Sequence, residues 1–175
     1  MNNKLLLGLR DELNHVVDTP ASTHRRAIEE LKKRFPHTIE LQPPFISGLF
    51  KEEYTCYMYA LNMLENQELY DYYFQRRRKA TRSRRGDYFL VEFIQYLVDD
   101  ARLLPAEDGI ILYFDAGRPV HAGKKSGEYV VSKWGNGNLW KHGIFEVPAV
   151  YGTTFKAYQE FSPEEVKKVF IEYCL

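Results

Sequence analysis

The sequence predicts a single α+β domain, and three observations lead to that prediction. Apolar residues recur at helical spacing through much of the first half of the chain, as Phe89, Phe93 and Leu97 illustrate. Beyond Pro105 they form short runs between glycine-containing turns, which is typical of an antiparallel meander. A length of 175 residues suits one domain with a full core, and helices followed by strands favour an α+β fold.

The predicted helices have recognisable starts and stops. Pro20 and Pro36 end the first two, and Ser22 or Thr23 is expected to cap the second. Ser162-Pro163-Glu164-Glu165 gives the last helix an N-cap, a proline at its first position and early acidic residues. We expect helices over residues 4–17, 22–35, 67–78 and 87–104, the last of them capped by Asp87. Two further helices are expected to begin at residues 54 and 162.

The predicted strands begin with a short one before the prolines at 43 and 44 and continue after Pro105. Gly135-Asn136-Gly137-Asn138 is the clearest hairpin turn among them. We expect strands at 38–41, 110–114, 120–123, 129–134, 144–147 and 153–158. In this division, residues 1–37 are a helical appendage and 38–175 form the core, with a helical, arginine-rich insertion at about 67–104.

Composition limits the classes of function. The formal net charge is zero, so the molecule as a whole has no general attraction to nucleic acid or to a membrane. No apolar run is long enough to span a bilayer, and the N-terminus lacks the pattern of a signal peptide. Two cysteines do not indicate a disulfide framework. We therefore expect a cytoplasmic protein, or one exported without an N-terminal signal peptide.

Cys56 is the candidate nucleophile. It is expected one turn inside a helix that starts at Tyr54, where the partial positive charge of the helix end favours a thiolate. His121 follows a predicted strand and is the candidate base, because cysteine catalysis needs a group that takes the thiol proton. Cys56 also shares a helical face with apolar neighbours, so a buried, inert cysteine is the alternative.

Five short motifs resemble a known family when they are taken in order. They are Cys56-Tyr57-Met58-Tyr59-Ala60, Val120-His121-Ala122, Ser132-Lys133-Trp134-Gly135, His142 and Val150-Tyr151-Gly152. Together they resemble the papain-like superfamily, in particular its NlpC-type branch, and more closely an uncharacterised bacterial family with the same motif order. The resemblance covers roughly residues 50–155. One departure is Thr55, where the similar sequences often have asparagine.

The resemblance implies a papain-like, NlpC-type fold, with an antiparallel sheet packed on the cysteine-bearing helix and extra N-terminal helices. It also implies a cysteine-dependent hydrolase or acyltransferase that acts on an amide or peptide bond through a thioester. In that mechanism Cys56 is the nucleophile, His121 the base, and backbone N–H groups around Thr55 and Cys56 bind the oxyanion. A cell-wall peptidase of the effector type and a cytoplasmic peptidase are two settings, and an inhibitor or immunity protein is a conceivable partner.

The third catalytic position is open among three residues. His142 is the first choice because it belongs to the shared motifs, Ser132 is the second and Glu146 the third. The residues expected to contact substrate are Tyr54, Ser132, Lys133 and Trp134.

Other chemistry is less supported by the sequence. The cysteines and histidines lack the spacing of a metal site, and no cofactor is implied. His24 and His37 lie on polar segments and are expected to be solvated. The basic run Arg76–Arg85 is most simply a solvated loop, but tyrosines nearby allow the alternative of a catalytically inactive module that binds an anionic or nucleic-acid partner there.

Overall fold

A six-stranded sheet forms the centre of the computed structural model, which describes residues 2–43, 54–81, 89–135 and 137–175, with the side chains of 77–81 excluded. The strand order is β1-β5-β4-β3-β2-β6, and the pairings are antiparallel. The strands are β1 (Glu40–Leu41), β2 (Pro105–Asp115), β3 (Arg118–Ser126), β4 (Tyr129–Lys133), β5 (Leu139–Gly143) and β6 (Thr154–Tyr158). The α+β prediction is therefore confirmed.

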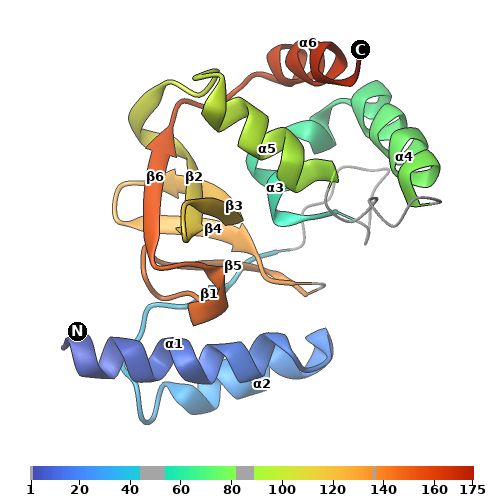
Figure 1. Ribbon diagram of the computed structural model, residues 1–175. Coiled ribbons are helices and arrows are strands. Elements are labelled where there is room, and N and C mark those ends of the chain that lie inside the picture. The colour runs from blue at the N-terminus through green and yellow to red at the C-terminus, as the bar shows by residue number, and fades with distance from the viewer. Residues whose placement is uncertain (1, 44–53, 82–88, 136) are drawn as a thin grey trace.

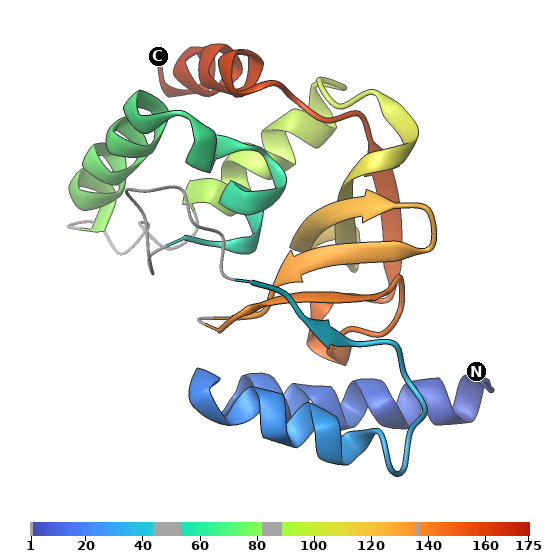
Figure 2. The ribbon, with the colours of Figure 1, turned by 180° about the vertical axis from the view of Figure 1, so that it is seen from behind.

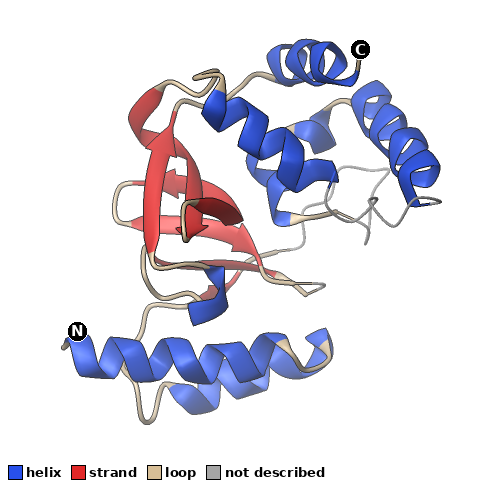
Figure 3. Cartoon of the chain, viewed as in Figure 1, coloured by secondary structure: helices blue, strands red, loops and turns tan. Residues whose placement is uncertain are grey.

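The helices cover both faces of this sheet (Figures 1 and 2). They are α1 (Asn3–Val17), α2 (Ala21–Leu31), α3 (Cys56–Ala60), α4 (Gln67–Thr81), α5 (Phe89–Asp99) and α6 (Pro163–Cys174), with short 3₁₀ turns η1 (Met63–Glu65) and η2 (Ala149–Tyr151). Figure 3 shows α3 to α6 gathered on one side and the α1–α2 pair on the other.

Alternation along β2 divides the apolar side chains into two cores. Ile110, Leu112 and Phe114 pack with the α3–α6 group. Ile111 and Tyr113 point the other way and pack with Leu9 and Leu13 of α1, together with Trp134 and Trp140. Because α1 supplies fully buried leucines to this second core, residues 1–37 are more than an appendage.

Several predicted boundaries are wrong for identifiable reasons. The helix expected over 87–104 ends at Asp99, and Ala101 then adopts a positive φ of 51° before β2 begins; the predicted cap at 87 lies outside the described residues. The strand expected at 144–147 is a turn, because the Glu146 side chain accepts a hydrogen bond from the Gly143 backbone N–H and closes it. The second helix begins at Ala21 after Pro20, without a side-chain cap.

The prediction that His24 and His37 are solvated is also wrong. They are 1% and 8% exposed, and their Nε2 atoms lie 2.9 Å from the Thr19 carbonyl and 3.1 Å from the Ile28 carbonyl. Each ring joins α2 to its flanking loop. A polar sequence context therefore hid two structural histidines.

Candidate active site

Cys56 begins α3 rather than lying one turn inside it. Thr55 is the N-cap, and its hydroxyl accepts a hydrogen bond from the Met58 N–H at 3.3 Å. The helix is only five residues long. The residue after Cys56 fixes the orientation of α3, because the Tyr57 hydroxyl donates to the Pro119 carbonyl at 3.0 Å, at the start of β3.

The Cys56 sulfur lies where β3 separates from β4. Within the described strands, β4 pairs with β3 only along Lys124–Ser126, so the earlier part of β3 has an open edge. The backbone N–H of Ala122 acts on the thiol from this edge. A strand N–H points within the plane of its sheet, so its acceptor lies near that plane. Cys56 therefore lies at the opening between the strands, against the backbone of Ala122, the residue that follows His121.

Burial dominates the electrostatics of the thiol. Loss of solvent raises the pKa of Cys56 to about 11, although the backbone N–H groups of Ala122, Tyr57 and Cys56 and the charge of Lys133 oppose that rise. The expectation of a thiolate favoured by the helix end is therefore wrong for this state. The physical reason is that a five-residue helix has a weak dipole, whereas the desolvation cost is large.

His121 lies on the α1 side of the sheet. Its ring stacks on Tyr151 with centroids 3.9 Å apart and an interplanar angle of 11°, and Tyr113 lies 5.7 Å away. The side chain is 1% exposed, and its Nε2 atom has no hydrogen-bond partner among the described residues. Burial, followed by the charge of His142, lowers the pKa of His121 well below its ordinary value. The imidazole is therefore neutral, with an unused nitrogen.

Tyr151 interacts with both Cys56 and His121. It stacks on His121, and the charge of Cys56 contributes, after burial, to raising its pKa. The predicted contact between Cys56 and His121 is not seen: Cys56 packs with the α3–α6 core, whereas His121 lies on the other face with Tyr113 and Tyr151.

None of the three candidates for the third catalytic position bonds to His121 in this structure. Trp134 Nε1 donates to Ser132 Oγ at 3.0 Å, and Ser132 Oγ lies 2.8 Å from His142 Nε2. His142 Nδ1 lies 2.8 Å from the Gly143 carbonyl, so both of its nitrogens are occupied. The expectation that His142 orients His121 through a hydrogen bond is therefore wrong; it acts on His121 only through its charge.

Glu146 is a structural carboxylate. Its oxygens accept from the backbone N–H of Thr38 at 3.0 and 3.1 Å and from the Gly143 N–H at 3.0 Å. The Thr38 hydroxyl donates to it at 2.5 Å. These contacts attach the segment before β1 to the turn after β5, so the carboxylate has no free oxygen to offer His121.

The residues expected to contact substrate fall into two groups. Ser132 and Trp134 are both 0% exposed and support the site from the core, so the expectation of direct substrate contact is wrong for them in this conformation. Tyr54 and Lys133 lie together beside Cys56: the Lys133 ammonium is 4.5 Å from the centre of the Tyr54 ring. Lys133 Nζ also donates to the Gly137 carbonyl at 2.8 Å.

The role of Tyr151 was not predicted from the sequence, although its motif was noted. The signal is the following glycine. Gly152 has a φ of +109°, and a Cβ there would lie 2.6 Å from the Phe114 carbonyl oxygen. Only glycine lets η2 approach β2 this closely, and that approach places Tyr151 over His121.

Features outside this site carry less chemistry. Among the described residues, no group of histidine, cysteine and acidic side chains could hold a metal ion. No helix in the described ranges is both long and apolar enough to cross a bilayer. The basic run lies partly in α4, not in a loop, and most of its side chains lie outside the described residues. Arg76, which is described, donates to the Tyr72 hydroxyl and the Cys174 carbonyl.

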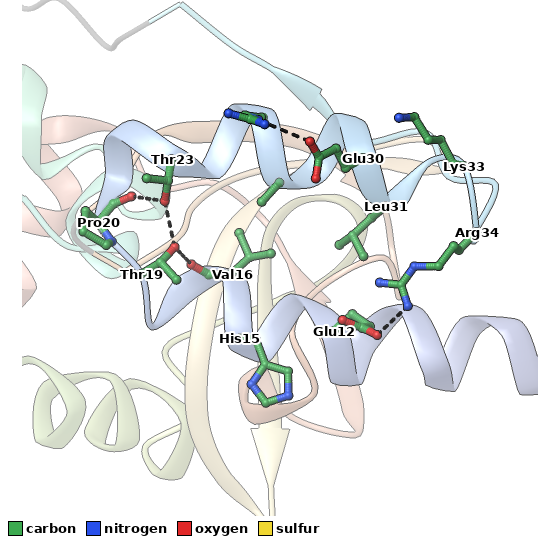
Figure 4. A pocket seen from close by; sticks show the side chains of 12 residues that line it. Glu12, His15, Val16, Thr19, Pro20, Thr23, Glu30, Leu31, Lys33 and Arg34 are labelled. Atoms are coloured by element: carbon green, nitrogen blue, oxygen red, sulfur yellow. Dashed lines mark hydrogen bonds and ion pairs between the residues drawn. The ribbon is translucent and has the colours of Figure 1, made fainter.

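A cavity lies between α1 and α2 (Figure 4). This cavity of about 830 Å³ has Val16, Ala27 and Leu31 among its lining residues, and an ion pair of 2.8 Å joins Glu12 to Arg34 at its rim. It contains none of the predicted site residues. We therefore treat the region around Cys56 as the candidate site.

Comparisons with family models, with curated proteins and with solved structures found no match to this chain.

Proposed function

We propose that this protein is a cysteine-dependent hydrolase or acyltransferase that acts on an amide or peptide bond, with a papain-like, NlpC-type arrangement of its site. The observation that supports this most is the position of the Cys56 sulfur against the Ala122 N–H, at the opening between β3 and β4. The residue before Ala122 is His121, which has a buried nitrogen without a hydrogen-bond partner in the described ranges. Cys56 thus lies against the residue that follows an unused base, and the proposal requires the His121 ring to reach the sulfur across the edge of β3.

The proposed reaction begins from two neutral groups. As the Cys56 sulfur attacks the substrate carbonyl, His121 Nε2 accepts the thiol proton. The oxyanion is bound by backbone N–H groups at the start of α3, and one such donor contributes about 3–4 kcal/mol to transition-state stability. His121 then gives the proton to the leaving amine. Water or another amine, deprotonated by the same imidazole, releases the acyl group from the thioester.

Neutral starting groups fit the electrostatics better than a preformed ion pair. Burial raises the pKa of Cys56 and lowers that of His121, so both effects disfavour a resting thiolate–imidazolium pair. The proton transfer is then coupled to attack on the carbonyl, as it is for a serine nucleophile. We therefore expect weak reactivity toward simple alkylating agents and greater reactivity toward acyl donors that occupy the site.

Acylation of Cys56 by an activated ester tests the proposal. A Cys174→Ser variant, which removes the other free thiol, is incubated with p-nitrophenyl acetate, and the acetylated residue is located by tandem mass spectrometry. We expect acetyl on Cys56, and its loss in Cys56→Ser. Acetylation of exposed lysines alone, with Cys56 unmodified, would contradict the proposal.

A further inference from the structure

Lys133 is a buried cation with no carboxylate partner in the part of the chain that the structure describes. It is 4% exposed at the end of β4, and among the described residues no carboxylate lies within 4.0 Å of its ammonium group. Its contacts are the Gly137 carbonyl and the face of the Tyr54 ring, both of which are neutral. Lysine is almost never buried to this degree unless it is paired. The contacts seen satisfy its donors only in part and leave its charge uncompensated.

The acidic group that faces Lys133 is the Cys56 thiol. Tyr54, which the ammonium covers, is two residues before Cys56, so the start of α3 and the end of β4 converge at this point. The effect is mutual: the charge of Lys133 lowers the pKa of Cys56, and the charge of Cys56 raises the pKa of Lys133. Burial is the larger cause for each group and acts in the opposite direction.

The other titratable groups that face the sulfur do not stabilise its anion. Tyr57 on α3 and Tyr151 on η2 both have raised pKa values, first because of burial and then because of the charge of Cys56, so both stay neutral phenols. His121 is neutral. Lys133 therefore provides the charge that a thiolate at position 56 needs.

We infer that Lys133 is the positioning residue for Cys56: its ammonium, held at the end of β4, stabilises the negative charge that develops on the sulfur as His121 takes the thiol proton. This inference rests on the proposed function, because it assigns the electrostatic partner of the same nucleophile. Lys133 does not touch the substrate; it acts through Cys56. The interaction of Lys133 with the Cys56 sulfur also explains why a lysine, rather than an apolar residue, is buried at the end of β4.

The test is the pH dependence of Cys56 alkylation in the Cys174→Ser background. The rate at which iodoacetamide alkylates Cys56 is compared among the protein with Lys133 and the variants Lys133→Met and Lys133→Arg. An opposite charge at close range lowers a pKa by roughly 1–3, so Lys133→Met is expected to reduce the alkylation rate at a fixed alkaline pH about tenfold or more. Lys133→Arg keeps the charge and is expected to recover most of the rate. Equal losses in both variants, with native circular dichroism, would overturn the inference.

A reciprocal measurement does not depend on the folding of a lysine variant. Near pH 11, where Cys56 ionises, replacing it with serine removes the anion, so Lys133 is expected to lose its proton more readily and to react several-fold faster with acetic anhydride, as followed by mass spectrometry. The exposed Lys168 on α6 is the control and should react unchanged. An unchanged rate at Lys133 would overturn the pairing.

These results separate the two proposals. If Lys133 controls the alkylation of Cys56 but no acyl-enzyme forms, the pairing stands and the proposed function fails. If Cys56 is acylated normally in Lys133→Met, while His121→Asn alone changes its alkylation profile, the proposed function stands and the role of Lys133 is wrong.

Discussion

Replacement of His142 by glutamine should make the protein less sensitive to acid. His142 is fully buried, and its neutral form completes a chain of hydrogen bonds. Because Trp134 Nε1 donates to Ser132 Oγ, the serine can donate its own proton to His142 Nε2, while Nδ1 donates to the Gly143 carbonyl. Protonated His142 would have no acceptor for the serine proton.

The magnitude follows from the pKa. Burial lowers the pKa of His142 from 6.5 to about 4, against weaker opposing effects of the Gly143 carbonyl and Glu146. The unfolded chain therefore binds a proton at this residue below about pH 6.5, whereas the folded chain does not do so until about pH 4. Stability is retained above that range and lost as the pH falls through it. At about 1.36 kcal/mol per pH unit, the loss between pH 6.5 and pH 5 is roughly 2 kcal/mol.

Urea denaturation at about pH 7.5 and about pH 5 measures this effect through the free energy of unfolding. His142→Gln is expected to lose about 2 kcal/mol less than the wild type between the two conditions, even if it is less stable at both. His15→Gln, which changes an exposed histidine on α1, is the matched control and should behave as the wild type. Equal losses in His142→Gln and wild type would refute the reasoning.

Three further substitutions test the packing around the site. Glu146→Gln should cost about 1–3 kcal/mol in the free energy of unfolding, since a buried network loses its charged acceptor; a change below about 0.5 kcal/mol would contradict this role. Gly152→Ala should lower the melting temperature much more than Gly117→Ala, because both have positive φ but only Gly152 has backbone atoms within contact distance of the added Cβ. Leu13→Ala should cost about 2–5 kcal/mol if α1 is part of the core, whereas a loss below about 1 kcal/mol would indicate a dispensable helix.

Local rules were sufficient for much of the fold. The last helix begins at Pro163, and its cap is the predicted one: Ser162 and Glu165 form a reciprocal capping box. Ile110–Phe114 is a buried run within β2, and the predicted turn falls between the end of β4 and the start of β5, with residue 136 outside the described residues. Each of these signals depends on neighbours in sequence, which is why it can be read without a structure.

The arrangement of the site depended on distant contacts and could not be predicted in the same way. His142 is opposite Val130 in the β4–β5 register, which brings it to Ser132 and Trp134 rather than to His121. The sequence places the three polar candidates in one region but does not reveal this pairing. The burial of Lys133 likewise results from the meeting of β4 with the segment before α3.

The pKa of Cys56 was predicted in the wrong direction for a related reason. A helix N-terminus is visible in the sequence, but the length of the helix and the burial of its first residue are not. Since α3 has five residues and the sulfur is desolvated where β3 separates from β4, the effect of desolvation on the pKa exceeds that of the helix dipole.

Release of an acyl group from Cys56 tests the central claim, that this thiol and His121 act together. After acetylation in the Cys174→Ser background, the loss of acetyl from Cys56 is followed by intact-protein mass spectrometry near neutral pH, for His121 and for His121→Asn. We predict release at least about a hundredfold faster with histidine, in keeping with general base catalysis of thioester hydrolysis. Equal rates in the two proteins would contradict the account.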